Sequence, residues 1–334
     1  MESSRNGIID QKLKVTLGGL PQKIHIKTRD ESLPVLLFLH GGPGVINRHS
    51  VMKTHTDLLD TFTLVAWDQR GSGGSYWGAP EETLTVTQMT DDAAQLVEWL
   101  CGRFKKDKLF IIGGSWGSEL GTHLAYRYPA KIAAYVGFGQ VVNGPKNEDI
   151  SYQFSLDAAR AAGDEEAVKR LDTLGPPENG VYKGGFDGLM IQRRVMMKYG
   201  GYSPDEKKRG FFSTQVKPIL LSCEYSPGDL IGVIKGYKYV LKAMWGEVAG
   251  SDLASECPEF EVPYFIFDGR LDFNTPASLV EEYFETIKAP RKELIWFESS
   301  GHNPMGDEPE LFKSTLRAKL SEVAESERAS GIRV

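Results

Sequence analysis

The sequence contains few of the residues that build disulfide frameworks or metal centres. Only three of its 334 residues are cysteines, Cys101, Cys223 and Cys257, and they are widely separated with no CxxC pair. That count and spacing argue against both a disulfide framework and a zinc site. The six histidines are scattered, and none lies in an HExxH or HxH motif. We therefore expect reduced, packed cysteines, no bound metal and no cofactor.

Long apolar runs and an excess of basic residues are also missing. No stretch of about 18 uninterrupted apolar residues occurs, and the start, MESSRNGIIDQK, lacks the basic and then apolar order of a secretory signal. The formal net charge is -6, so long-range attraction to nucleic acid or to an anionic membrane is not expected. We predict a cytoplasmic protein that acts on a small molecule, with no nucleic-acid or membrane partner.

Short apolar segments alternate with amphipathic ones at the two ends of the chain. The segment Pro34–Leu39, PVLLFL, is apolar throughout, which is typical of a strand buried on both faces. Alternation of this kind predicts an α/β fold with a mostly parallel sheet flanked by helices. Further strands are expected at Leu13–Leu17, Lys23–Lys27, Thr63–Trp67, Leu109–Ile112, Ala134–Phe138, Pro263–Phe267 and Glu293–Phe297, and helices around Val51–Leu59, Thr87–Phe104 and Glu308–Ala324.

The alternation stops between Val142 and Glu261. This segment is charged and helical in character, contains the breakers GPPENG and GGYSPDEKK, and is too long to be a loop. Some of its apolar and aromatic residues, such as Phe186 and Tyr237, are expected to line a mainly apolar pocket. The chain therefore divides into a first part of the core, 1–141, an inserted helical cap, 142–261, and a second part of the core, 262–334.

A candidate nucleophile lies between a predicted strand and a predicted helix. Residues 113–117, GGSWG, spell G-x-S-x-G directly after the strand LFII and directly before the helix-compatible run SELGTHLAYRY. A sharp turn at this place holds the serine in a strained conformation, and the glycines let helix and strand approach each other. The helix start also directs N–H groups and a positive dipole end toward developing negative charge. We predict Ser115 as the nucleophile.

The loop after PVLLFL has little side-chain bulk. His40 is followed by GGPG, so this loop can bring a backbone N–H close to a substrate carbonyl. A tetrahedral oxyanion needs two hydrogen-bond donors, and we assign this role to the backbone N–H groups of Gly42 and Trp116. Gly41, which is also expected beside the substrate, is the alternative to Gly42. His40, at the strand end, is interpreted as a structural hydrogen-bonding residue.

The acid and the base are expected in loops after late strands. Only two histidines follow the serine, and His123 falls in the helix behind it, which leaves His302, after ELIWF, as the general base. Two aspartates follow PYFIF. Asp272 better reaches a histidine in the neighbouring loop, whereas Asp268, at the strand end beside a glycine, is interpreted as a turn residue. We predict that Asp272 orients His302 and that His302 takes the Ser115 proton.

Several motifs, in this order along the chain, resemble the proline iminopeptidase-like branch of the α/β-hydrolase superfamily. The resemblance implies an α/β-hydrolase fold with an inserted helical cap over the active site, and a triad of Ser115, Asp272 and His302. The segment Asp68–Arg70 matches a hallmark of the branch, and we interpret it as structural. The motifs are HGGPG at 40–44, WDQRGSGGS at 67–75, GGSWGS at 113–118, GRLD at 269–272 and SGH at 300–302.

The resemblance implies less about the substrate. Aminopeptidases of this branch hold the free α-amino group with cap glutamates in a recognisable local sequence, which this cap does not match. Glu224, in LSCEYSPGD, is the counterpart that we consider for substrate binding. The predicted function is a serine hydrolase that cleaves amide or ester bonds through an acyl-enzyme. The alternatives are a carboxylesterase or lactonase acting on a small apolar substrate, and a non-catalytic ligand-binding protein on the same scaffold.

Overall fold

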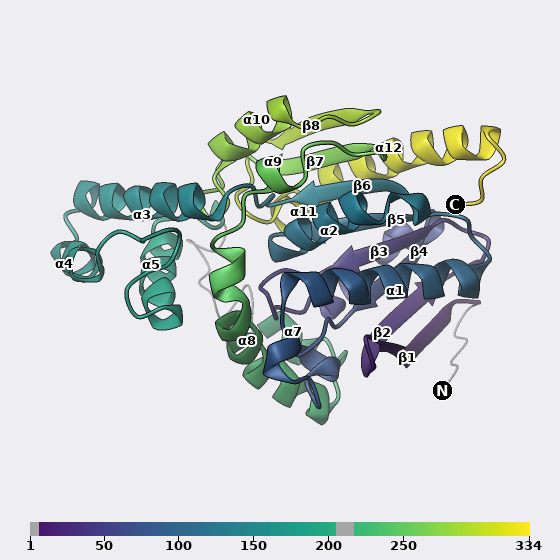
Figure 1. Ribbon diagram of the computed structural model, residues 1–334, viewed down its shortest axis with the longest axis horizontal. Coiled ribbons are helices and arrows are strands. Elements are labelled where there is room, and N and C mark those ends of the chain that lie inside the picture. The colour runs from purple at the N-terminus through teal and green to yellow at the C-terminus, as the bar shows by residue number, and fades with distance from the viewer. Residues whose placement is uncertain (1–6, 205–216) are drawn as a thin grey trace.

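The computed structural model describes residues 7–204 and 217–334, and within them an eight-stranded sheet forms the centre of the molecule (Figure 1). The strand order is β1-β2-β4-β3-β5-β6-β7-β8. Strands β1 and β2 pair antiparallel with each other, and β2 pairs antiparallel with β4, while all other neighbours are parallel. The strands are β1 Ile9–Leu17, β2 Leu20–Thr28, β3 Val35–Leu39, β4 Thr63–Trp67, β5 Leu109–Gly114, β6 Ile132–Phe138, β7 Tyr264–Gly269 and β8 Lys292–Phe297.

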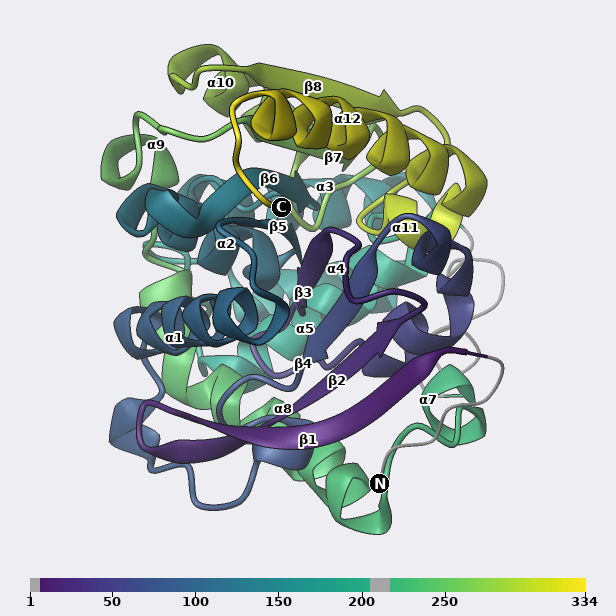
Figure 2. The ribbon, with the colours of Figure 1, turned by 90° about the vertical axis from the view of Figure 1, so that its right-hand side faces the viewer.

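The central strands are apolar at nearly every position because helices cover both faces of the sheet. Consecutive side chains of a strand point to opposite faces, so Leu37 and Leu36 belong to two different apolar cores. Helices α1 (Val86–Phe104), α2 (Trp116–Arg127) and α10 (Ala277–Thr286) cover the first face, and α12 (Pro309–Ala329) covers the second (Figure 2). The predicted α/β-hydrolase architecture is therefore confirmed.

The helix expected around Val51–Leu59 is replaced by two single turns. A π-helical turn covers Ser50–Thr54 and a 3-10 turn covers Thr56–Asp60. His55 separates them with φ of −110° and ψ of 31°, which lies outside the α-helical region. The apolar side chains still face the core, since Leu58 and Leu59 are buried. The pattern indicated burial correctly but overestimated the helix length.

Six helices connect β6 to β7 within the described residues, and we call them the cap helices. In Figure 1, α3, α4 and α5 project beyond the sheet, and α8 is the longest of the six. A capping box begins α8, because the Ser226 side chain accepts from Asp229 N–H and the Asp229 carboxylate accepts from Ser226 N–H. The cap helices are α3 Gly144–Ala161, α4 Glu165–Leu174, α5 Phe186–Lys198, α7 Lys217–Leu221, α8 Pro227–Val248 and α9 Leu253–Glu256. These helices lie inside the predicted insertion, whose domain boundaries at 142 and 261 stay a prediction.

None of the helices in the described ranges combines the length and the hydropathy that a membrane span requires.

Candidate active site

Ser115 lies in a strained turn between β5 and α2. Its φ of 55° and ψ of −128° lie in a region that residues with a side chain rarely occupy, and such a conformation costs about 1 to 3 kcal/mol. The Ser115 N–H donates to the Phe138 carbonyl at the end of β6, at 3.0 Å, and the Ser115 carbonyl accepts from Ser118 at 2.7 Å. The turn is therefore fixed by the neighbouring strand and by the first turn of α2.

The glycines around the serine are required by close packing. A Cβ on Gly114 would lie 2.2 Å from the Phe138 ring, and a Cβ on Gly117 would lie 2.2 Å from the Leu39 carbonyl oxygen. Both distances are far below van der Waals contact. Only a turn without these side chains can pack between the ends of β3 and β6. Gly117 is the second glycine of the G-x-S-x-G pattern, and a Cβ on the first, Gly113, would lie 2.0 Å from the Gly117 carbonyl oxygen.

Asp272 and His302 form a buried pair. His302 Nδ1 lies 2.8 Å from Asp272 Oδ2, and the two side chains are 4% and 0% exposed. The carboxylate also accepts from the backbone N–H groups of Asn274, at 2.7 Å, and Thr275, at 3.0 Å, and from the Thr275 hydroxyl at 2.7 Å. These donors hold the carboxylate as an acceptor, so His302 presents Nδ1–H to it and directs Nε2 away.

The end of β6 brings the pair next to Ser115, the predicted nucleophile. A Cβ on Gly139 would lie 2.9 Å from the His302 ring, and the residue before it, Phe138, accepts the Ser115 N–H. The imidazole and the nucleophile turn thus contact consecutive residues of one strand end. On the opposite side, the Tyr202 ring lies 4.9 Å from the His302 ring between centroids, and the Tyr202 carbonyl accepts the His302 N–H at 2.6 Å.

The predicted oxyanion loop lies against the serine. A Cβ on Gly41 would be 3.1 Å from Ser115 Cβ and 3.7 Å from Ser115 Oγ. Gly42 has φ of 117°, and within residues 7–204 and 217–334 its N–H donates to no acceptor. Trp116 is the first residue of α2, so its N–H has no acceptor within its own helix. Both N–H groups are therefore available for a ligand oxygen.

Gln69 joins the oxyanion loop to the nucleophile turn, a role that the sequence did not reveal. Its side chain donates to the His40 carbonyl at 3.0 Å and accepts the Trp116 indole N–H at 2.8 Å. His40 accepts the Gln69 backbone N–H on Nε2 at 3.1 Å. Burial lowers the pKa of His40 to about 4, against a weaker opposing effect of its hydrogen bond to Gly41. His40 is therefore neutral and structural, as we interpreted it.

Asp268 lies inside β7 and not in the turn that the sequence indicated, whereas Asp272 follows the strand. The two aspartates have different surroundings. Asp268 is completely buried, and its Oδ1 accepts the Gly139 N–H at 2.8 Å. Burial, together with the charge of Asp272, raises the pKa of Asp268 well above its usual range. Asp268 thus lies behind the strand end that touches His302, whereas Asp272 is the aspartate that bonds the imidazole.

Glu224 lies in a buried cluster of charges between the cap and the first two strands. Its carboxylate is 2.6 Å from His25 Nδ1 and 2.9 Å from Lys12 Nζ. Asp229, at the start of α8, is held similarly by Lys23 at 2.6 Å and Arg48 at 2.9 Å. These contacts attach α8 to the sheet. The structure brings Glu224 to β1 and β2, and its role in substrate binding stays a prediction.

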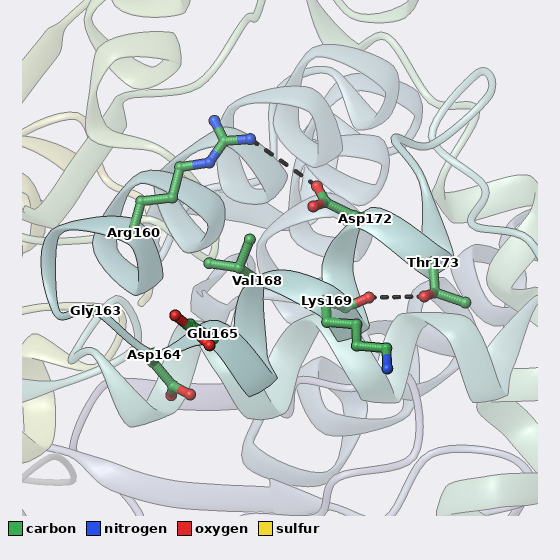
Figure 3. A pocket seen from close by; sticks show the side chains of 8 residues that line it. All are labelled: Arg160, Gly163, Asp164, Glu165, Val168, Lys169, Asp172 and Thr173. Atoms are coloured by element: carbon green, nitrogen blue, oxygen red, sulfur yellow. Dashed lines mark hydrogen bonds and ion pairs between the residues drawn. The ribbon is translucent and has the colours of Figure 1, made fainter.

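A surface hollow of about 500 Å³ lies at the outer end of the cap helices (Figure 3). Its lining comes from the end of α3, from most of the length of α4 and from the turn between them, and Arg160 and Asp172 face each other across it at 4.0 Å. This lining is largely charged and exposed, and it includes none of the predicted catalytic residues. In the part of the chain that the structure describes, no cluster of three His, Cys, Asp or Glu side chains could hold a metal ion.

Comparisons with known proteins agree with this architecture. The family model described as alpha/beta hydrolase fold matches residues 34–174. The chain is 30% identical over 306 residues to the probable aminopeptidase YbaC of Bacillus subtilis (strain 168), covering 91% of this chain and 94% of that protein.

Two solved structures resemble the fold equally well. A proline iminopeptidase from Mycobacterium smegmatis has a TM-score of 0.63 at 17% identity and covers 95% of this chain and 99% of its own. A thermophilic esterase from Thermogutta terrifontis also has a TM-score of 0.63, at 19% identity, with 94% and 99% coverage. Because two enzymes with different names fit equally, this likeness shows the fold and does not separate peptide from ester substrates.

Proposed function

The chain belongs to the α/β-hydrolase family, in its proline iminopeptidase-like branch, and from this premise we propose that it cleaves amide or ester bonds through an acyl-enzyme on Ser115. The observation that supports the proposal is the hydrogen-bonded pair of Asp272 and His302 at the strand end that also fixes the strained serine turn. A strained residue is maintained only where the surrounding structure compensates for it, and such residues cluster at functional sites.

The reaction follows from the positions of these groups. His302 Nε2 takes the Ser115 proton while the serine oxygen forms a bond to the substrate carbonyl carbon. When the tetrahedral intermediate collapses, the bond to the leaving nitrogen or oxygen breaks, and His302 returns the proton to that atom. Water then attacks the acyl-enzyme with the same proton transfers and frees Ser115. Asp272 fixes the tautomer of the imidazole throughout and stabilises its protonated form.

The negative charge of the intermediate requires two donors. The Gly42 and Trp116 N–H groups are the proposed pair, on either side of Ser115. One such donor contributes about 3 to 4 kcal/mol of transition-state stabilisation. Gln69 positions both of them, because it holds the His40 carbonyl and the Trp116 indole in one hydrogen-bond chain.

A second candidate function, a carboxylesterase or lactonase, is favoured by the pairing of the buried cap carboxylates. An aminopeptidase needs an unpaired carboxylate for the substrate ammonium group. Among the described residues, Glu148 is paired with Arg193, Glu224 with His25 and Lys12, and Asp229 with Lys23 and Arg48. An ester or lactone substrate would not require any of these pairs to open.

Substrate profiling tests the proposal. We would measure kcat/KM for proline and alanine arylamides, for the same arylamides with a blocked amine, and for short and medium acyl aryl esters, with Ser115→Ala as the blank. Preference for the free amine by more than about tenfold, which is about 1.4 kcal/mol, supports an aminopeptidase. A smaller preference together with faster ester cleavage supports the second function. Absence of Ser115 labelling by a fluorophosphonate would contradict both.

A further inference from the structure

Two consecutive carbonyls of the cap accept hydrogen bonds from two loops of the sheet edge. One is the loop after β7, which carries Asp272 and which we call the acid loop; the other is the loop after β8, which carries His302 and which we call the base loop. The Gly201 carbonyl accepts the N–H of Phe273, in the acid loop, at 2.9 Å, and the Tyr202 carbonyl accepts the N–H of His302 at 2.6 Å. The main chain of the cap thus connects the two loops.

Helix α3 of the cap contacts the acid loop at two further points. Asn147, which is 6% exposed, donates from its side chain to the Asn274 carbonyl at 2.9 Å. The Phe154 ring stacks on the Phe273 ring, with centroids 3.9 Å apart and planes 15° apart. Asn147 and Phe154 are seven residues apart, which is about two helical turns, so one face of α3 makes both contacts. The two residues that follow Asp272 are therefore both bound by α3.

These cap contacts add to a direct contact between the two loops. The Leu271 N–H donates to the Ser300 carbonyl at 2.9 Å, so the loops stay together without the cap. The 2.8 Å distance between Asp272 Oδ2 and His302 Nδ1 requires a more exact placement of both loops. A misplacement of about 1 Å can lower a catalytic rate by about 100-fold. Contacts that limit the motion of the acid loop therefore affect the reaction more than they affect the fold.

Building on the proposed function, we propose that Phe154 is a positioning residue of the triad, whose ring holds the acid loop so that the Asp272 carboxylate stays within hydrogen-bond distance of His302. Asn147 supports the same loop from the same helix. The stacked rings of Phe154 and Phe273 are half-buried and lie outside the apolar cores of the described residues. Their contact can therefore be removed without opening a cavity in a core.

The test is the pH dependence of kcat/KM for Phe154→Ala. The carboxylate of Asp272 stabilises the protonated imidazole, so a looser contact between them moves the acid limb of the profile to lower pH. We expect a shift of about half a pH unit, with kcat about fivefold lower and KM within about twofold of the original enzyme. The substitution leaves in place the described titratable groups around His302 and its loop, which are Asp272, Asp268, Tyr202, Asp307 and Glu308.

Tyr239→Ala is the matched control, because it also removes a half-buried ring of the cap. This ring packs against Tyr76, and its hydroxyl donates to the Ala79 carbonyl, so its contacts with the core are not with the acid loop or the base loop. We expect kcat within about twofold of the original enzyme, which is about 0.4 kcal/mol, and an acid limb that does not move. A general loosening of the cap would change both variants alike.

The outcomes separate positioning from a structural role. A folded Phe154→Ala variant whose acid limb does not move overturns the inference, and so does an equal shift in Tyr239→Ala. If Phe154→Ala does not fold, Asn147→Ala decides, with an expected shift of about 0.3 pH unit in the same direction; an unmoved limb there also overturns the inference. If a fluorophosphonate does not label Ser115 in the original enzyme, it is the proposed function that fails.

Discussion

The carboxyl edge of the sheet and the cap helices use their buried polar residues in opposite ways. At the sheet edge, the serine, the acid and the histidine each follow a strand, and their partners are backbone groups or side chains of adjacent loops. In the cap, buried carboxylates such as Glu224 and Asp229 bond basic residues more than 180 positions away in the chain. In our proposal the first region carries the catalytic groups, and the second attaches the cap to the sheet.

The comparison teaches where sequence patterns are informative. A strand end fixes the direction of the next few residues, so a short motif can predict a site. A buried carboxylate on a helix can serve as a ligand for substrate or as half of an ion pair, and its own sequence neighbours do not distinguish the two. The substrate therefore depends on long-range pairing that no motif in the cap describes.

The largest expected effect contrasts Asp268, inside β7, with Asp272, which follows the strand. Asp272→Asn should lower kcat by about 10³- to 10⁴-fold, because the amide favours the wrong imidazole tautomer. Asp268→Asn should change kcat by less than about tenfold, because an asparagine oxygen can still accept the Gly139 N–H. Steady-state kinetics with both variants check this, with thermal unfolding as the control for folding. Equal losses would contradict the different roles that we give to the two carboxyls.

Sequence reasoning located most of the fold because buried strands have a strong pattern. The expected strands all correspond to observed ones, with ends shifted by a few residues, and β1 and β2 extend further than their apolar cores suggested. Asn274 and Thr275 were missed at the site, although both directly follow Asp272 in DFNT. Their contacts with His302 depend on how the loop folds back, and neither residue type indicates that by itself. Gln69 was missed for the same reason.

The second-largest effect is expected on the free energy of unfolding, when an ion pair that attaches the cap to the sheet is removed. Glu224→Ala should lower the free energy of unfolding by about 3 kcal/mol, since, among the described residues, the buried His25 Nδ1 loses its only partner carboxylate and Lys12 keeps only the backbone carbonyl of residue 224. The matched control is Glu166→Ala, at an exposed cap position paired only with Arg170, with a change of less than about 0.5 kcal/mol. Urea unfolding measures both. If Glu224 binds a substrate amine instead, KM for free-amine arylamides will rise while stability changes little.

A smaller effect is expected from three histidines in the segment between β3 and β4. Burial lowers the pKa of His40, His49 and His55 to about 4 each, below the value of about 6.5 in an unfolded chain. Below about pH 6.5 the unfolded state therefore binds more protons than the folded state. The contribution of these neutral histidines to the free energy of unfolding is complete above about pH 6.5 and is lost as the pH falls toward 4. His55→Gln should recover about 1 to 2 kcal/mol of the loss between pH 7 and pH 5. Urea unfolding at both pH values measures it, and an equal loss in the variant would contradict the assignment.

The smallest effect is expected from a substitution in the surface hollow on the cap, which contains none of the proposed catalytic residues. Arg160 and Asp172 are about half exposed and 4.0 Å apart, so Arg160→Ala should change the free energy of unfolding by less than about 0.5 kcal/mol. Because the hollow is lined by the end of α3 and by α4 and contains no proposed catalytic residue, kcat/KM should stay within about twofold of the original enzyme, which is about 0.4 kcal/mol. A tenfold loss of kcat/KM without loss of stability would mean that substrate contacts this outer end of the cap. That result would contradict the proposed division between a catalytic sheet edge and a cap that serves only for attachment and positioning.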